Sequence, residues 1–161
     1  MSRFATFILL GLVGQLAGCG FQLQGAFAAP AAMERTYIDA SDRHSLFYRD
    51  LRHALQAAGV DVVESRAAST ATLSILFDDT GQRVLSVSAR NVPTEYEVYY
   101  TIRYALDQGE RQWLDPQMLT VTRNYTYDST LVLGKAREEE QLRESLSDDL
   151  VRLVLKQISA L

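Results

Sequence analysis

Few side chains in this sequence of 161 residues could act as nucleophiles or metal ligands. It contains one cysteine, Cys19, and two histidines, His44 and His53. One cysteine and two histidines cannot build a Cys/His zinc site. The two histidines are nine residues apart, about 900° around a helix, so on a helix they would lie on opposite sides. We therefore expect no metal site and no cofactor.

The sequence also lacks the short motifs that accompany common enzyme chemistry. It has no Gly-x-Ser-x-Gly turn, no glycine-rich phosphate loop and no His-Glu-x-x-His pair. A Ser-His-Asp site could still assemble from distant loops. We expect both histidines to be exposed helix residues, no catalytic residues, and a protein that is not an enzyme.

Cys19 has a more specific chemistry at the end of an apolar segment. Residues 4–16 are almost wholly apolar, but this run is shorter than the roughly 20 residues that a membrane-spanning helix needs. Leu16-Ala17-Gly18-Cys19 follows and resembles the bacterial lipobox, in which the cysteine sulfur receives a diacylglyceryl group before cleavage leaves that cysteine first. Stable anchoring takes two or more acyl chains. An aspartate directly after the lipidated cysteine commonly retains lipoproteins in the inner membrane. This chain has Gly20 at that position, so we expect the protein to be located in the outer membrane.

The remaining chain is long enough for one domain. We expect a lipoprotein signal peptide over residues 1–18, a lipidated N-terminus and tether over 19–34, and a single α+β domain over 35–161. The chain has 16 Lys and Arg residues against 20 Asp and Glu residues, a net charge of −4. Nucleic-acid binding needs clustered positive charge, so we expect no nucleic-acid partner.

Hydrophobic periodicity predicts a strand-rich middle between two helices. Strands are predicted at residues 35–39, 60–63, 71–77, 83–90, 95–107 and 118–127, with turns at 78–81 and 107–110; helices are predicted from 41 to 58 and from 136 to the end. Two amphipathic helices and a largely antiparallel sheet can bury their apolar faces only against each other. The expected fold is therefore a two-layer α+β sandwich with both helices on one face.

The clearest strand alternates strictly, which predicts one buried face and one wetter face. The side chains expected to meet in the core are Tyr96, Val98, Tyr100, Ile102 and Tyr104 from the strand, with Leu51, Leu55, Leu146, Leu150 and Leu153 from the helices. Tyr99, Thr101 and Arg103 fall on the wetter face. Because Tyr and Arg are frequent in interface hot spots, these three residues are candidates for partner contact.

Several segments in order resemble the LptE family of lipopolysaccharide-assembly lipoproteins. The run Cys19-Gly20-Phe21-Gln22-Leu23-Gln24-Gly25 is similar to the start of that family, although Gln24 stands where an arginine is common. Arg90 with Glu95-Tyr96 resembles the family's central hairpin. Residues 123–128 resemble its Arg-Asp-Tyr-x-Tyr-Asp motif, and residues 133–150 resemble its final helix.

This resemblance implies a fold, a partner and a ligand. Family members plug the lumen of the large outer-membrane β-barrel LptD from the periplasmic side, and the pair inserts lipopolysaccharide into the outer leaflet. The family fold is a sheet with two helices packed on it. The basic pair implicated in lipopolysaccharide contact corresponds here to Arg90 and Lys135. Lipid A phosphates are anionic, and an arginine side chain offers them a bidentate fork.

Two other interpretations remain open at the level of sequence. One is a lipoprotein hydrolase or glycan-binding module facing the periplasm, which a cleft with paired carboxylates would favour. The other is a structural lipoprotein that binds no ligand.

The lipobox makes a direct prediction about Cys19. Cys19→Ala removes the sulfur atom that accepts the diacylglyceryl group. The variant should remain an uncleaved precursor that incorporates no acyl label, because modification precedes cleavage. Metabolic labelling with a fatty acid and the size of the product on a gel would check this. A mature-sized, acyl-labelled product from the variant would contradict the assignment.

Overall fold

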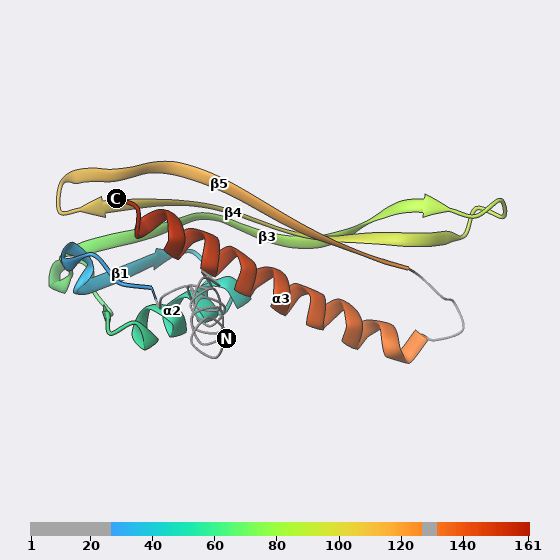
Figure 1. The fold of residues 1–161 in the computed structure, drawn as a ribbon, viewed down its shortest axis with the longest axis horizontal. Helices are drawn as coiled ribbons and strands as arrows, with labels where there is room; N and C mark the ends of the chain where they lie inside the picture. Colours follow the sequence, from blue (N-terminus) through green and yellow to red (C-terminus); the bar gives the residue numbers. More distant parts are fainter. Residues whose placement is uncertain (1–26, 127–131) are drawn as a thin grey trace, which may run out of the picture.

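The computed structural model describes residues 27–126 and 132–161, and of residues 132–136 it describes the backbone alone. The strands are β1 (Arg35–Ala40), β2 (Asp61–Val63), β3 (Ala71–Val87), β4 (Pro93–Gln108) and β5 (Arg111–Thr126). The helices are α2 (Leu46–Ala57) and α3 (Val132–Ile158), with short 3-10 turns η2 (Ala31–Met33) and η3 (Arg66–Ala68). Both helices lie against one face of the sheet, which is the expected two-layer arrangement (Figure 1).

The sheet has the strand order β2-β1-β3-β4-β5 and is mixed. Strand β1 runs parallel to both of its neighbours, whereas β3, β4 and β5 pair antiparallel. Parallel neighbours need a crossover connection, and α2 supplies it between β1 and β2. The predicted α+β class is confirmed, and the antiparallel part is the long β3–β4–β5 meander.

The core forms between β4 and the two helices. Val98, Tyr100, Ile102 and Tyr104 are at most 1% exposed, and Leu51, Leu55, Leu146 and Leu150 are fully buried, as predicted. Two predicted members lie elsewhere. Tyr96 is half-buried and stacks on Tyr125, with 5.6 Å between the ring centroids. Leu153 is 40% exposed. Val154 and Ile158 continue the stripe of Leu146 and Leu150 in steps of four residues, and Leu153 lies at its edge.

The two largest core side chains use their hydroxyl groups to hold the helices. The Phe47 N–H in the first turn of α2 donates to the Tyr100 hydroxyl over 3.0 Å, so an otherwise unpaired helix N–H is satisfied. The Tyr104 hydroxyl donates to Gln157 of α3. Burial raises the pKa of Tyr100 above its usual range and that of Tyr104 to about 12, so both hydroxyls keep their protons at neutral pH.

The turn predicted at residues 78–81 is wrong, because β3 runs straight through it. Asp78 lies on the helix side and accepts a 2.6 Å hydrogen bond from the Ser45 hydroxyl at the start of α2. Gly81 pairs with Tyr99 of β4, and a Cβ atom there would stand 2.6 Å from the Tyr99 hydroxyl oxygen. Gly81 therefore makes room for the ring of Tyr99. The presence of a glycine at this position had indicated a turn.

The other element boundaries differ from the predictions in both directions, and α2 begins at Leu46, later than predicted. Strand β5 begins at Arg111 and α3 at Val132, both earlier than predicted. Strand β3 ends at Val87, so Arg90 lies beyond the strand, in the turn of the β3–β4 hairpin. That hairpin extends past the body of the molecule (Figure 1). The predicted turn before β5 is present, with Gly109 at φ +59°.

The two faces of β4 should respond differently to truncation. Ile102→Ala removes a fully buried side chain and should lower the free energy of unfolding by about 2–5 kcal/mol. Thr101→Ala removes one exposed hydrogen bond, 2.9 Å long, to Thr120 and should cost about 1 kcal/mol or less. Urea unfolding followed by circular dichroism would measure both. Equal losses from the two variants would contradict this assignment of faces.

Candidate functional site

The face of the sheet opposite the helices is open in the described part of the chain. Tyr99, Thr101 and Arg103 lie on this outer face, in alternation with the buried residues of β4. Strand pairing places neighbours beside them: Thr101 opposite Thr120, and Arg103 between Phe77 of β3 and Met118 of β5. The sequence-predicted contact residues are therefore together on one surface.

Two apolar side chains on this surface were not predicted from the sequence. Phe77 is 47% exposed and Met118 is 63% exposed. Simple alternation along residues 71–77 would place Phe77 on the same face as buried Leu73 and Ile75, but a bulge between Ile75 and Phe77 changes the face. No sequence signal locates that bulge. We call Phe77, Tyr99, Thr101, Arg103 and Met118 the outer-face patch.

The hairpin turn positions Arg90 at the far end of the molecule. The Ser88 N–H donates to the Val92 carbonyl over 2.8 Å, and the Asn91 N–H donates to the Ser88 carbonyl over 2.9 Å. Asn91 adopts a left-handed conformation, φ +59°, which asparagine tolerates better than most residues. Arg90 is exposed. A short ordered turn thus presents this guanidinium group to solvent.

The other predicted site residues are placed less fully. Lys135 belongs to the first turns of α3, and its side chain lies outside the described residues, as does the whole of Cys19. The first turns of α3 and the β3–β4 hairpin extend toward the same end of the molecule (Figure 1). The backbone segments that carry Arg90 and Lys135 thus lie toward the same end of the molecule.

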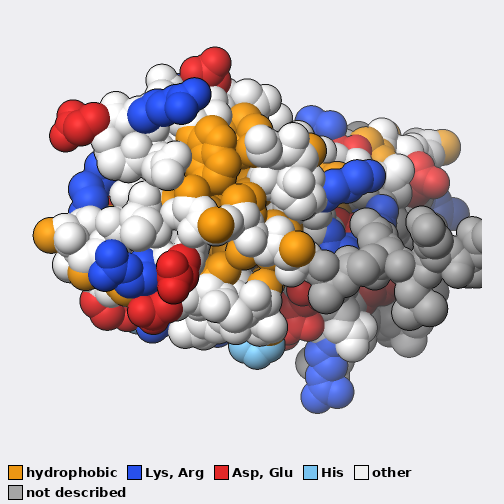
Figure 2. Space-filling view, turned by 60° about the vertical axis from the view of Figure 1, so that its left-hand side comes forward, with side chains coloured by type: hydrophobic (Ala, Val, Ile, Leu, Met, Phe, Trp, Pro, Cys, Tyr) orange, Lys and Arg blue, Asp and Glu red, His pale blue; other side chains and the backbone are white. Residues whose placement is uncertain are grey.

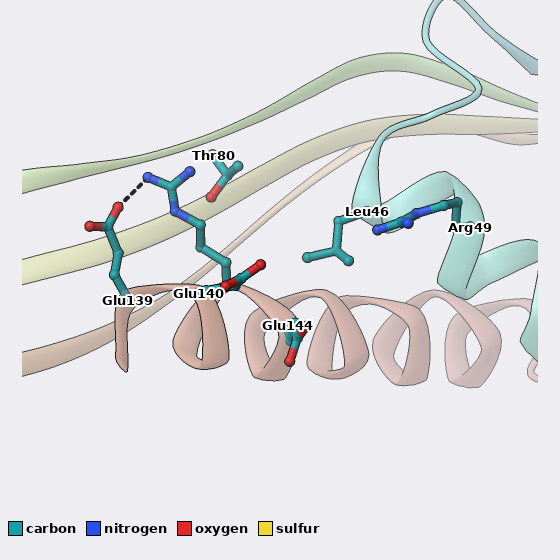
Figure 3. Close-up of a pocket in the computed structure, with 7 residues that line it drawn as sticks. Leu46, Arg49, Thr80, Glu139, Glu140 and Glu144 are labelled. Atoms are coloured by element: carbon teal, nitrogen blue, oxygen red, sulfur yellow. Dashed lines mark hydrogen bonds and ion pairs between the residues drawn. The ribbon is translucent and has the colours of Figure 1, made fainter. Parts of the chain in front are cut away.

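A groove of about 450 Å³ separates α2, α3 and β3 (Figure 3). Its lining residues are Leu46, Arg49, Thr80, Glu139, Glu140, Arg143 and Glu144. Arg143 pairs with Glu139, while Glu140 and Glu144 are exposed one helical turn apart. A glycosidase acid needs a carboxyl group whose pKa is raised by burial or by a close carboxylate. Glu140 and Glu144 are both exposed to solvent, so the groove does not contain the buried carboxyl pair that would favour the hydrolase interpretation.

Nothing else in the described residues resembles a reaction centre. His44 is exposed just before α2 and His53 is exposed on it. Among residues 27–126 and 137–161, no three His, Cys, Asp or Glu side chains are grouped closely enough to hold a metal ion. In the same described part, no helix is both long and apolar enough to cross a membrane.

Sequence comparison connects this arrangement with known proteins. A family described as LptE, lipopolysaccharide-assembly, matches residues 33–158. The "LPS-assembly lipoprotein LptE" of Pectobacterium atrosepticum is 27% identical over 155 residues, covering 92% of this chain and 83% of the relative. The protein with the same name from Yersinia pestis strain Pestoides F is 25% identical over 154 residues, covering 94% and 73%.

Solved structures agree on the fold. The solution structure of lipoprotein B from Nitrosomonas europaea superposes with a TM-score of 0.73 at 28% identity, covering 88% of this chain and 91% of that one. The rare lipoprotein B of Shewanella oneidensis gives a TM-score of 0.68 at 21% identity, covering 78% and 94%, and this match shows the fold alone. The family match spans both helices and all strands of the sheet, and the chain therefore belongs to the LptE family of lipopolysaccharide-assembly proteins.

Proposed function

We propose that this chain is an outer-membrane lipoprotein of lipopolysaccharide assembly, anchored through Cys19 on the periplasmic side. In this role it plugs and supports a large LptD-type β-barrel and binds lipopolysaccharide during insertion into the outer leaflet. The observation that carries the proposal is the family match over residues 33–158, which covers nearly the whole described domain. The names of the relatives describe assembly of lipopolysaccharide and no enzymatic activity.

The outer-face patch is the surface that we assign to the barrel. A sheet face that carries exposed Phe77 and Met118 leaves apolar area in water, which burial against a partner would remove. Arg103, between them, can hydrogen-bond to polar groups of the same partner. The Tyr99 ring is held in place over Gly81, so it loses little conformational freedom on binding.

Arg90 and Lys135 are the groups that we assign to the lipopolysaccharide phosphates. Arg90 is exposed on an ordered turn, so phosphate oxygens can approach its guanidinium group from solvent. The chain as a whole has a net charge of −4, so an anion is attracted only where cations are locally in excess. Residues 80–94 of the hairpin contain Arg83 and Arg90 and no acidic residue, and Arg83 is paired with Glu97, so Arg90 is the cation that the hairpin offers to an anion.

The outer-face patch should be required for the barrel to co-purify. In cells that contain only this chain as their LptE protein, Phe77→Lys/Met118→Lys should reduce the recovered barrel about tenfold, because hot-spot side chains contribute most of an interface's free energy. Leu161→Lys is the matched control, since Leu161 is 49% exposed elsewhere and should leave recovery unchanged. Quantitative immunoblots would measure the barrel protein.

Two outcomes would contradict the assignment. Unchanged recovery of the barrel with the patch variant would remove the patch as the contact surface. Normal surface lipopolysaccharide after depletion of the whole chain would remove the assembly function itself and would favour the structural-lipoprotein interpretation.

Charge reversal should separate ligand binding from barrel binding. Arg90→Glu/Lys135→Glu should weaken binding of lipopolysaccharide by the full, detergent-solubilised protein. Binding by the parent should fall with added salt, because salt screens the attraction between exposed charges, largely beyond about 8–10 Å at physiological ionic strength. The barrel should still co-purify, since Arg90 lies far from the outer-face patch along the hairpin. If the variant binds as tightly as the parent, these two residues are not the lipopolysaccharide site.

A further inference from the structure

Strand β5 forms one edge of the sheet, and none of the described strands pairs with its outer side. An unpaired edge offers a row of backbone N–H and C=O groups to another extended chain. The opposite edge strand, β2, has three residues, whereas β5 has 16. In the described sheet, β5 therefore provides the long open edge.

Most of this edge lacks the features that usually protect one, which are charged side chains, proline and bulges. Asp115 and Pro116 stand at a register shift against β4, but they protect only the start of β5. Residues 117–126 pair regularly with β4 and include one charged residue, Arg123. Its guanidinium group is already paired with Asp149 of α3 over 2.7 Å. We call residues 117–126 the β5 edge segment.

The side chains of the β5 edge segment are sorted by face. The outer face carries Met118, Thr120, Thr122, Asn124 and Thr126, and the inner face carries Gln117, Leu119, Val121, Arg123 and Tyr125. When two copies of one strand pair antiparallel about a twofold axis normal to the sheet, each face meets the same face of the other copy. Threonine then lies beside threonine and aliphatic side chains beside aliphatic ones, which stabilises a pair of strands. The segment is thus complementary to itself.

The helices cover the inner face of this segment incompletely. Leu119 and Val121 are half-buried, although the residues opposite them on β4 are at most 1% exposed. On α3, Asp149 faces β5 through its ion pair with Arg123, and Leu153 lies one helical turn further along that side. Leu153 is 40% exposed. A second sheet added at the edge would bring further apolar side chains against these three partly covered ones.

Other surfaces do not match a second copy in this way. The end of the molecule that faces the viewer in Figure 2 shows a group of hydrophobic side chains with acidic and basic side chains around it. A partner there must complement a fixed arrangement of both charges. In the groove beside α3, Glu140 and Glu144 would repel the same residues of another copy (Figure 3). Among these surfaces, the β5 edge segment is the one that suits an identical chain.

We propose that two copies of this chain form a twofold dimer in which their β5 edge segments pair antiparallel. The two five-stranded sheets then join into one continuous sheet, with all four long helices on one of its faces. The outer-face patches of both copies remain open on the other face. Pairing closes an edge that would otherwise accept other extended chains. The partner is a second copy, so the dimer does not depend on the barrel assigned above.

Symmetric disulfide formation tests the pairing and locates its axis. Single cysteines replace each residue from 118 to 125, one at a time, in the full-length protein solubilised in detergent. Identical positions approach within about 4.5–5.5 Å between Cα atoms only at the axis, as a disulfide requires, and each residue away from it adds about 7 Å. We expect one sharp maximum of crosslinked dimer between positions 120 and 124, at least tenfold above exposed Leu161→Cys. The parent protein controls for Cys19.

Substitution on the exposed side of the segment provides a second readout. Thr122→Lys/Asn124→Lys places like charges across the pairing line and should weaken self-association at least tenfold. Gln56→Lys/Leu161→Lys adds the same charge at exposed positions elsewhere and should leave self-association unchanged. Sedimentation equilibrium in density-matched detergent measures the dissociation constant of the protein alone. Thermal unfolding should show that both variants remain folded.

Three outcomes would overturn the dimer. The first is the mass of a single copy at every protein concentration. The second is crosslinking that is equal along the segment and at position 161. The third is an equal dissociation constant for the two lysine variants, which would move the association to another surface. Recovery of the barrel is measured separately, so the proposed function and the dimer can fail independently.

Discussion

The burial of one face of β4 against two helices organises this protein. Tyr100 and Tyr104 fill the space between the layers and also bind α2 and α3 through their hydroxyl groups. A buried hydroxyl without a partner would destabilise the core, so these two hydrogen bonds fix where each helix lies along the strand. The exposed positions of Tyr99, Thr101 and Arg103 on the opposite face of β4 follow from this arrangement.

Because the helices cover one face of the sheet, the side chains of the opposite face stay exposed in the described part of the chain. The strands β3 and β4 are also longer than the helical layer can cover, so their hairpin continues alone and carries Arg90 past the body (Figure 1). The outer-face patch, on β3, β4 and β5, and the end of the β3–β4 hairpin are therefore separate surfaces.

The sequence predicts what depends on periodicity and misses what depends on local irregularity. Strict alternation from Tyr96 to Leu106 was enough to assign the faces of β4, and most of the helical stripe in α3 was found in the same way. The bulge that turns Phe77 outward and the close fit of Tyr99 over Gly81 depend on neighbouring strands, which no single segment encodes. Arg90 was found by resemblance, since its exposure depends on where β3 ends.

Radical footprinting tests most directly whether the sheet lies between helices and a partner. Hydroxyl radicals would label Met118 and Phe77 in the isolated protein and in its complex within outer membranes, with exposed Leu161 as the internal reference. The account predicts that Met118 and Phe77 become protected in the complex while Leu161 reacts equally in both states. Equal labelling of Met118 and Phe77 in the two states would contradict it.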